Sequence, residues 1–341
     1  MTMYGLYQPY KVDRPLTKGE RNLQLKQGRR QKTEYINSGQ SVIRLNSTCL
    51  ETVDKFYNKK GIDSLWALIV FIGSLSIVFY AFFRGVFFLL PVHGIVKIFL
   101  TSLIPIPITL FGAYFVFKEW CRWTHYPIRF NRKNGMVYVF RTNGTVLHAP
   151  WTDIFFTRSK DPGPLREWCI RGHILDKRGE TVRETFSLGV CGNKDSLAEY
   201  WEFIRCYMEE DVVRELADLV VLCPPVENRK EGFVFGFQTL IYMESRIEWL
   251  FLPVMLPLSL IGAVARYIAS QTSKIPRWPQ DIEDACRMEP GDPVSVSAVD
   301  NPKDMWRLVL ANQTYTDWQK LYARREAATK KIIEILDTRY Q

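Results

Sequence analysis

The sequence lacks the residue patterns that usually mark a metal centre, a disulfide framework or a catalytic site. Its 341 residues include seven cysteines and four histidines, which are scattered with no CxxC pair and no zinc-like spacing. No glycine-rich phosphate loop and no nucleophile elbow occur. We therefore expect reduced cytosolic thiols, no metal, no cofactor and a protein that is not an enzyme.

Charge is missing from two stretches of the chain, Ser64 to Phe83 and Ile98 to Phe117. Each is about 20 residues long, the length at which a helix crosses the hydrocarbon core of a bilayer. Residues 63–118 are therefore predicted to form a transmembrane hairpin, against the alternative of a buried hairpin in a soluble protein. Pro105 and Pro107 interrupt the second stretch and predict a kink there.

We also expect no cleavable signal peptide, because the first 60 residues are polar and basic and have no apolar core. Twelve Lys and Arg residues precede the first apolar stretch and more follow the second, whereas the connection between the stretches has only Arg84 and Lys97 at its edges. The positive-inside rule then predicts that a basic N-terminal tail, residues 1–62, and the central domain are both cytoplasmic.

The net charge of +9 suggests an anionic partner. In a membrane-anchored chain, the anionic lipid of the inner leaflet is a more economical partner than nucleic acid. The most basic stretch of the tail, Lys26 to Lys32, reads KQGRRQK and has no aromatic residue between its charges. We interpret it as a solvated segment on the membrane surface and expect no nucleic-acid partner.

The region after the apolar stretches has the pattern of an antiparallel meander. Its turn signals are Asn134-Gly135 and Asn143-Gly144, which are typical of hairpins. An amphipathic helix follows, capped by Asp195 or Ser196. A bent sheet closed by one helix predicts a pleckstrin-homology-like domain over residues 119–218. The predicted strands are Tyr126 to Asn131, Met136 to Arg141, Thr145 to Ala149, Trp151 to Arg158, Glu167 to Leu175 and Thr181 to Leu188.

Trp151 and Asp153 follow Pro150 where the fourth predicted strand begins. We interpret the pair as a structural corner, in which the indole packs in the core. The alternative is that the indole makes a binding contact, since tryptophan serves in both places.

A third apolar region lies within residues 219–270. Trp249 to Ala265 is free of charge but only 17 residues long, with Pro253 and Pro257 one turn apart. Three arrangements fit this segment: a third spanning helix, a re-entrant pair, or a helix that lies in the membrane interface. The choice among them decides on which side of the membrane the C-terminus resides.

The C-terminal region, residues 271–341, begins with a loop rich in proline and acidic residues. A long helix is predicted from about Pro302 to Asp337, because Asn301 before Pro302 is a good start signal. Its apolar side packs on the body or on another protein. The fold class is therefore predicted as an α+β membrane protein with an antiparallel β domain between helical segments.

The run IRFNRKNGMVYVFRTNGTVLHAPWTDIFF, Ile128 to Phe156, after a double membrane segment, resembles bacterial DUF6708-type membrane proteins. The similarity covers roughly residues 63–218 and carries no catalytic residues. Such proteins occur near type VI secretion and polymorphic-toxin loci. The resemblance implies a multi-pass protein of the bacterial inner membrane with a toxin-associated role, above all as an immunity protein.

The leading hypothesis is accordingly an immunity protein that neutralises a cognate secreted toxin by direct binding. The alternative is a non-enzymatic membrane scaffold or accessory protein of a secretion system, whose pleckstrin-homology-like domain binds lipid or protein. For toxin contact the first candidates are basic residues able to meet an acidic surface, although a solvated face near anionic lipid explains them as well. These residues are Arg129, Arg132, Lys133, Arg141, Arg158 and Lys160.

Overall fold

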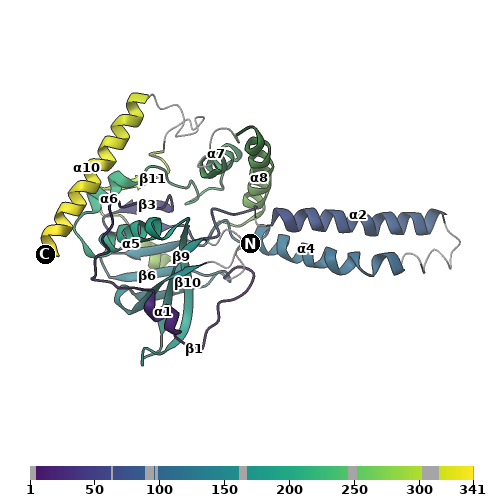
Figure 1. Ribbon diagram of the computed structural model, residues 1–341, viewed down its shortest axis with the longest axis horizontal. Helices are drawn as coiled ribbons and strands as arrows, with labels where there is room; N and C mark the ends of the chain where they lie inside the picture. The colour runs from purple at the N-terminus through teal and green to yellow at the C-terminus, as the bar shows by residue number, and fades with distance from the viewer. Residues whose placement is uncertain are drawn as a thin grey trace.

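The computed structural model describes residues 5–62, 64–88, 96, 99–160, 167–244, 252–301 and 315–340. It is an α+β structure with two antiparallel sheets and surrounding helices, from which a pair of long apolar helices projects to one side (Figure 1). The α+β class is confirmed. The body holds both sheets and the C-terminal helix, and the C-terminus lies at the end of the body opposite the projecting pair (Figure 1).

One sheet has five strands in the order β1-β10-β9-β8-β2. Its three long strands lie where the aromatic and β-branched runs predicted them. The edge strands β1 and β2 have two residues each and come from the N-terminal region. The bounds are β1 Arg14–Pro15, β2 Gln24–Leu25, β8 Ile154–Lys160, β9 Trp168–Leu175 and β10 Thr181–Cys191.

The other sheet has six strands in the order β11-β3-β4-β5-β6-β7. Both predicted turns are present, with positive φ angles of 67° at Gly135 and 88° at Gly144, which glycine adopts without strain. A short 3-10 helix, η1 Trp151–Asp153, joins β7 to β8 and so connects the sheets. The bounds are β3 Val42–Asn46, β4 Cys49–Thr52, β5 Ile128–Asn131, β6 Met136–Phe140, β7 Val146–Pro150 and β11 Ser295–Ser297.

The N-terminal region is not the separate basic tail that the sequence predicted. Strands β1 and β2 pair with β10 and β8, and β4 pairs with β5 on the far side of the apolar helices. A short helix, α1 Lys18–Asn22, is closed by a capping box in which Thr17 and Glu20 satisfy each other's backbone amides. The correction has a physical reason: strands this short gain their stability from partners distant in sequence.

Helix α5, Lys194–Glu209, follows β10 and buries one face against both sheets. Its cap is Asn193, whose side chain accepts a hydrogen bond from the Ser196 amide, so the helix begins before the predicted Asp195 or Ser196. Trp201 is fully buried and packs against Phe156 from the five-stranded sheet. The sheets and α5 thus share one hydrophobic core. Helix α6, Val213–Leu219, extends it.

The projecting pair consists of α2, Leu65–Phe88, and α4, Pro105–Trp120. The segments Leu65–Arg84 and Phe99–Trp120 are long and apolar enough to cross a membrane. Gly112 lets the helices approach closely, since a Cβ there would lie 3.0 Å from the Ala67 carbonyl oxygen. The helical course is interrupted at residues 103–104, directly before Pro105, where the sequence placed a kink.

The third apolar region forms α7, Phe233–Glu244, and α8, Leu252–Thr272, with Pro257 inside α8. These two helices pack on each other, and α8 also contacts α4. Figure 1 shows α8 beside the base of the projecting pair and running across its direction. Residues 249–251 of the predicted Trp249 to Ala265 segment lie outside the described residues.

The C-terminal region contributes two helices, α9 Gln280–Ala285 and α10 Tyr315–Arg339. Residues 302–314, the predicted start of the long helix, lie outside the described residues. Helix α10 packs on α6 and inserts Ala328, Ile332 and Leu336 into the main core. Of the two partners considered for this helix, the body of the same chain is the one present.

Candidate binding site

The sequence-predicted basic residues lie in and beside both sheets, and the first of them is buried. Arg129 on β5 is 2% exposed, and its guanidinium lies 4.5 Å from the centre of the Trp278 ring. Its Nη2 donates to Glu283 at 2.9 Å, and its Nε lies 3.1 Å from the Glu51 carboxylate. A guanidinium held in this way ties β5 to α9 and leaves little charge for a partner.

The other five residues also have partners within the protein. Arg132 lies 3.4 Å from Asp211, and Arg141 lies 2.9 Å from Glu184. The remaining contacts join Lys133 to Glu289, Arg158 to Gln31 and the Lys160 ammonium to the face of the Trp168 ring. Arg158 and Lys160 are on β8 of the five-stranded sheet, whereas Arg129 is on β5 of the six-stranded one. The structure thus distributes the six over two sheets.

The corner residues have different surroundings. Trp151 is buried, and its ring stacks on Trp201 with centroids 5.5 Å apart. Its indole Nε1 donates to Glu209 at 2.9 Å, which satisfies the polar end of the ring. Asp153 is exposed, and its carboxylate accepts a hydrogen bond from Thr152. The tryptophan therefore contributes core packing, and the aspartate faces solvent.

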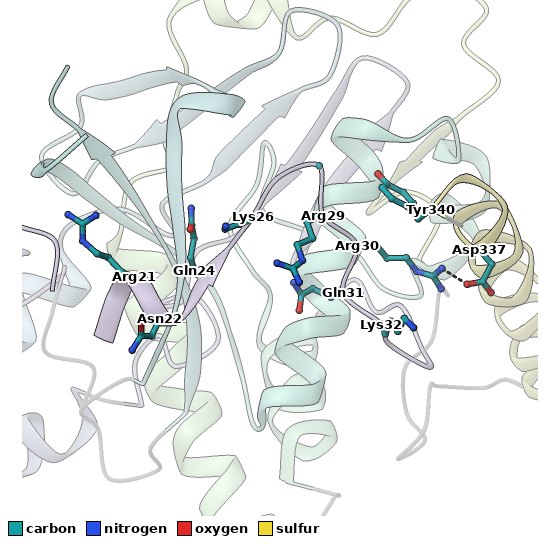
Figure 2. A pocket seen from close by; sticks show the side chains of 11 residues that line it. Arg21, Asn22, Gln24, Lys26, Arg29, Arg30, Gln31, Lys32, Asp337 and Tyr340 are labelled. Atoms are coloured by element: carbon teal, nitrogen blue, oxygen red, sulfur yellow. Dashed lines mark hydrogen bonds and ion pairs between the residues drawn. The ribbon is translucent and has the colours of Figure 1, made fainter. Parts of the chain in front are cut away.

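A basic groove on the body gathers the residues that the sequence assigned to a solvated stretch. We call it the basic groove; its volume is about 950 Å³. Figure 2 shows its side chains following one another from Arg21 through Lys26 and Arg29 to Asp337 and Tyr340 at the end of α10. The lining residues are Arg21, Asn22, Gln24, Lys26, Gly28, Arg29, Arg30, Gln31, Lys32, Asp337 and Tyr340.

The groove's backbone is fixed to α5 beneath it. The Gly28 amide donates to the Glu209 carboxylate at 3.0 Å, and the Gln31 amide donates to Glu202 at 2.8 Å. The side-chain amide of Gln27 donates to the carbonyl oxygens of Trp151 and Ile154. The segment between β2 and residue 32 is therefore held in one course, although it contains no regular secondary structure.

A buried arginine organises the floor of the groove. Arg205 on α5 is fully buried and forms ion pairs with Glu202, Glu209 and Glu210, and it also donates to the Tyr340 hydroxyl. Burial by itself would lower the pKa of Arg205, but hydrogen bonds and the charge of its carboxylates outweigh burial and raise the pKa. The floor carries three carboxylates, which pair with Arg205 and, at Glu210, also with Arg339, so the positive charge of the groove comes from its rim.

Part of the chain, which includes helix α5 below this groove, matches a known protein family. Residues 106–290 match the model of a family of unknown function, DUF6708. The match spans more than half of the chain. The protein belongs to the DUF6708 family. No curated protein and no solved structure matches it.

The DUF6708 range runs from α4 through strands β5 to β10 and helices α5 to α9, and it leaves out β1 to β4 and β11. All eleven residues that line the basic groove lie outside this range, either before residue 33 or after residue 336. The sequence signal for the groove was KQGRRQK. What the sequence did not reveal is that the end of α10 meets this stretch, a contact between residues 307 positions apart.

A second polar cluster joins the apolar helices to the body. The Lys60 ammonium donates to the carbonyl oxygens of Glu119 and Trp123, and the Glu119 carboxylate accepts from the Gly61 amide and the Tyr7 hydroxyl. Burial lowers the pKa of Lys60 to about 8, against the charges of Glu119 and Asp54. The cluster fixes the start of α2 and the end of α4 to the same part of the body.

Beside it, Asp54 and His125 are also buried. Burial raises the pKa of Asp54 to about 6, although backbone amides donate to its carboxylate, and burial lowers the pKa of His125 to about 3. Across the described ranges, no group of three or more His, Cys, Asp or Glu side chains is arranged to hold a metal ion. The cluster is best described as a structural joint.

Proposed function

We propose that this DUF6708 protein is anchored in a membrane by α2 and α4. The supporting observation is that their large apolar side chains face outward: Trp66 and Phe79 on α2 are at least 70% exposed, and Leu110 on α4 is 66% exposed. A helix that is apolar on all sides needs either burial in protein or lipid around it, and protein covers little of these two. Lipid is the environment that fits them.

The proposed placement puts the body on the cytoplasmic side of a bacterial inner membrane. Basic residues flank the body-side ends of both helices, as the positive-inside rule requires. Helix α8 supports the same placement, because it crosses the direction of the pair at its base and exposes Leu258, Ile261 and Val264 (Figure 1). Of the three arrangements open for this segment, we propose the interfacial helix.

We further propose that the anchored protein acts as an immunity protein that neutralises a cognate secreted toxin by direct binding. The resemblance to proteins of type VI secretion and polymorphic-toxin loci motivates this role. The body suits a binding role, because two sheets closed by α5 form a rigid module, for which we propose a pleckstrin-homology-like relationship. Anchoring would hold this module where a toxin that attacks or crosses the membrane arrives.

The test is survival of cells exposed to the toxin encoded beside the gene. The arms are the intact protein, a variant in which a Gly-Ser linker replaces residues 64–117, and a variant that carries an unrelated transmembrane hairpin there. Protection by the intact and re-anchored proteins, and its loss in the linker variant, is the expected result. Absence of protection by the intact protein, at matched expression and with the body folded, contradicts the immunity role.

The second candidate is a membrane scaffold or accessory protein of a secretion system. It is favoured by the basic groove, a preformed surface that does not require a toxin as its partner. Crosslinking in cells separates the two roles: a scaffold is captured with secretion or envelope components when no toxin is expressed, whereas an immunity protein is captured with its toxin.

A further inference from the structure

We propose that the basic groove binds an extended acidic segment of a soluble protein partner. The inference deepens the proposed function. It rests on that function in one respect, namely that the chain acts by binding a protein. It names the surface and the chemistry of the partner. Because it is tested on the purified chain, it can hold or fail separately from toxin protection.

Unpaired charge on the rim is the first argument. Arg21, Lys26, Arg29 and Lys32 are exposed, and within the described ranges none of the four has a carboxylate partner. Among the described residues that line the groove, the acidic one is Asp337, and the carboxylates of Glu202 and Glu209 beneath it are engaged by Arg205 and by backbone amides. Four cations along one wall attract a chain of carboxylates and steer its approach. Since each exposed pair contributes little, a ligand needs several acidic residues in succession.

The groove already accommodates a carboxylate of the protein itself. Asp337, near the end of α10, forms an ion pair with Arg30 (Figure 2). Arg30 is only partly exposed, and planar guanidinium groups match carboxylate geometry. This internal pair shows the kind of contact that an incoming Asp or Glu would make with the neighbouring free cations.

The shape of the site suits an extended chain. Strand β2 is an edge strand of the five-stranded sheet and lies beside the groove, and within the part of the chain that the structure describes its one partner strand is β8. Peptides commonly bind by adding to such an edge. The wall is also preorganised, because the Gly28 and Gln31 amides are held by α5, which lowers the entropic cost of binding.

The position of the groove argues against lipid as the ligand. In Figure 1, the C-terminal end of α10, which bounds one end of the groove, lies at the end of the body opposite the apolar pair, and α1, which bounds the other end, lies at the lower side of the body. When α2 and α4 cross the bilayer, the α10 end of the groove therefore lies at the end of the body farthest from the headgroups. Electrostatic attraction to an anionic membrane falls off within about 8 Å at physiological salt.

Its composition argues against single-stranded nucleic acid. Sites for single strands combine cations with aromatic rings on which bases stack. Tyr340 is the only aromatic residue in the lining, and its hydroxyl donates to Glu210 at 2.8 Å. The remaining polar residues, Asn22, Gln24 and Gln31, are amides that hydrogen-bond readily to a peptide backbone.

The experiment measures binding of fluorescein-labelled decaglutamate to the full-length protein in a nonionic detergent, by fluorescence anisotropy at low salt. The double variant Arg29→Glu/Lys32→Glu is expected to weaken binding at least tenfold. The matched control, Lys177→Glu/Arg178→Glu, reverses two exposed charges in the turn between β9 and β10 and is expected to change the Kd less than twofold. Asp337→Asn frees Arg30 and is expected to tighten binding about threefold.

Each opposing result overturns the proposal in a defined way. Equal losses in the two double variants, with circular dichroism showing both folded, mean that the peptide senses only net charge. Tighter binding of a labelled ten-nucleotide thymidine strand assigns the groove to nucleic acid. Displacement of the peptide by phosphatidylglycerol vesicles assigns it to lipid. Failure of the wild-type protein to bind decaglutamate removes acidic peptides from consideration.

Discussion

The body and the projecting pair use the same apolar residue types in opposite ways. In the body, Phe156 and Trp201 are completely buried, whereas in the pair Trp66 and Phe79 are 72% and 70% exposed. Water makes large continuous apolar surfaces unfavourable, so one solvent does not suit both regions. The contrast supports the proposal that lipid surrounds the pair while water surrounds the body, with the boundary where α2 leaves the body.

At this boundary the protein places buried charges in pairs. Arg266 on α8 is 1% exposed, and its Nε and Nη2 donate to the Glu231 carboxylate at 2.6 and 2.8 Å. It also donates to the carbonyl oxygens of Tyr57 and Asn58, which precede α2. The boundary is therefore stabilised by hydrogen bonds and ion pairs, whereas the regions on either side of it are built mainly from apolar side chains.

The largest effect should come from a core aromatic, because its loss leaves a cavity. We expect Trp151→Ala to lower the free energy of unfolding by about 3–5 kcal/mol. The control Phe79→Ala removes an equally apolar ring from the exposed surface of α2 and should leave the melting temperature of the body nearly unchanged. Both are measured by thermal denaturation in detergent. A similar loss from both variants would mean that exposure does not distinguish the two regions.

Loss of the buried Arg266–Glu231 pair should destabilise the protein almost as much. Arg266→Met leaves the buried Glu231 carboxylate without its cation, although the Tyr57 hydroxyl still donates to it, which should cost about 3–5 kcal/mol in the free energy of unfolding. The double variant Arg266→Met/Glu231→Gln removes the uncompensated charge and should recover part of the loss. Denaturant unfolding of the four proteins completes the cycle. A double variant that loses the sum of the two single losses would show that the pair is not coupled.

A charge introduced into the apolar pair should impair insertion into the membrane and leave the stability of the body unchanged. Leu75→Arg puts a cation at the middle of α2, where an arginine costs about 2.5–3.5 kcal/mol for insertion into a membrane. We expect a larger fraction of this variant to be released by alkaline extraction of membranes. Val299→Arg, at a 91% exposed position of the body, is the control. Unchanged membrane retention of Leu75→Arg would contradict spanning.

Sequence reasoning succeeded where the signal was local. The Asn-Gly turns and the alternating residues around them located β5 to β10 to within a few residues, and the absence of charge located the apolar helices. Strands β3 and β4 escaped prediction because the turn between them, at Ser47 and Thr48, has no glycine, and β4 pairs with β5 across the entire apolar pair.

The site was harder to predict, because its contacts are distant in sequence. The sequence alone presents the charge of Arg129 as available to a partner, because Glu51 and Glu283, which pair with it, are 78 and 154 positions away. Conversely, KQGRRQK looked like an unstructured stretch, since its anchors Glu202 and Glu209 belong to α5. The availability of a charge depends on its tertiary neighbours, and neither composition nor spacing contains them.

The smallest effect concerns pH and comes from buried titratable groups of the body. Burial lowers the pKa of His125 to about 3 and that of His173 to about 4, so both stay neutral in the folded state at pH 5 while they are protonated in the unfolded chain. Asp54 acts in the opposite sense, because its folded pKa of about 6 favours the folded state on acidification.

Two histidines against one aspartate leave a net uptake of about one proton on unfolding between pH 6 and 5. As the pH falls from 6 to 5, the free energy of unfolding should therefore decrease by about 1.4 kcal/mol. His125→Gln removes one of the two histidines and should flatten the slope, because Asp54 then offsets the remaining one. The measurement is denaturant unfolding at pH 5, 6 and 7. Rising stability on acidification in the wild-type protein would mean that the buried carboxylate outweighs both imidazoles.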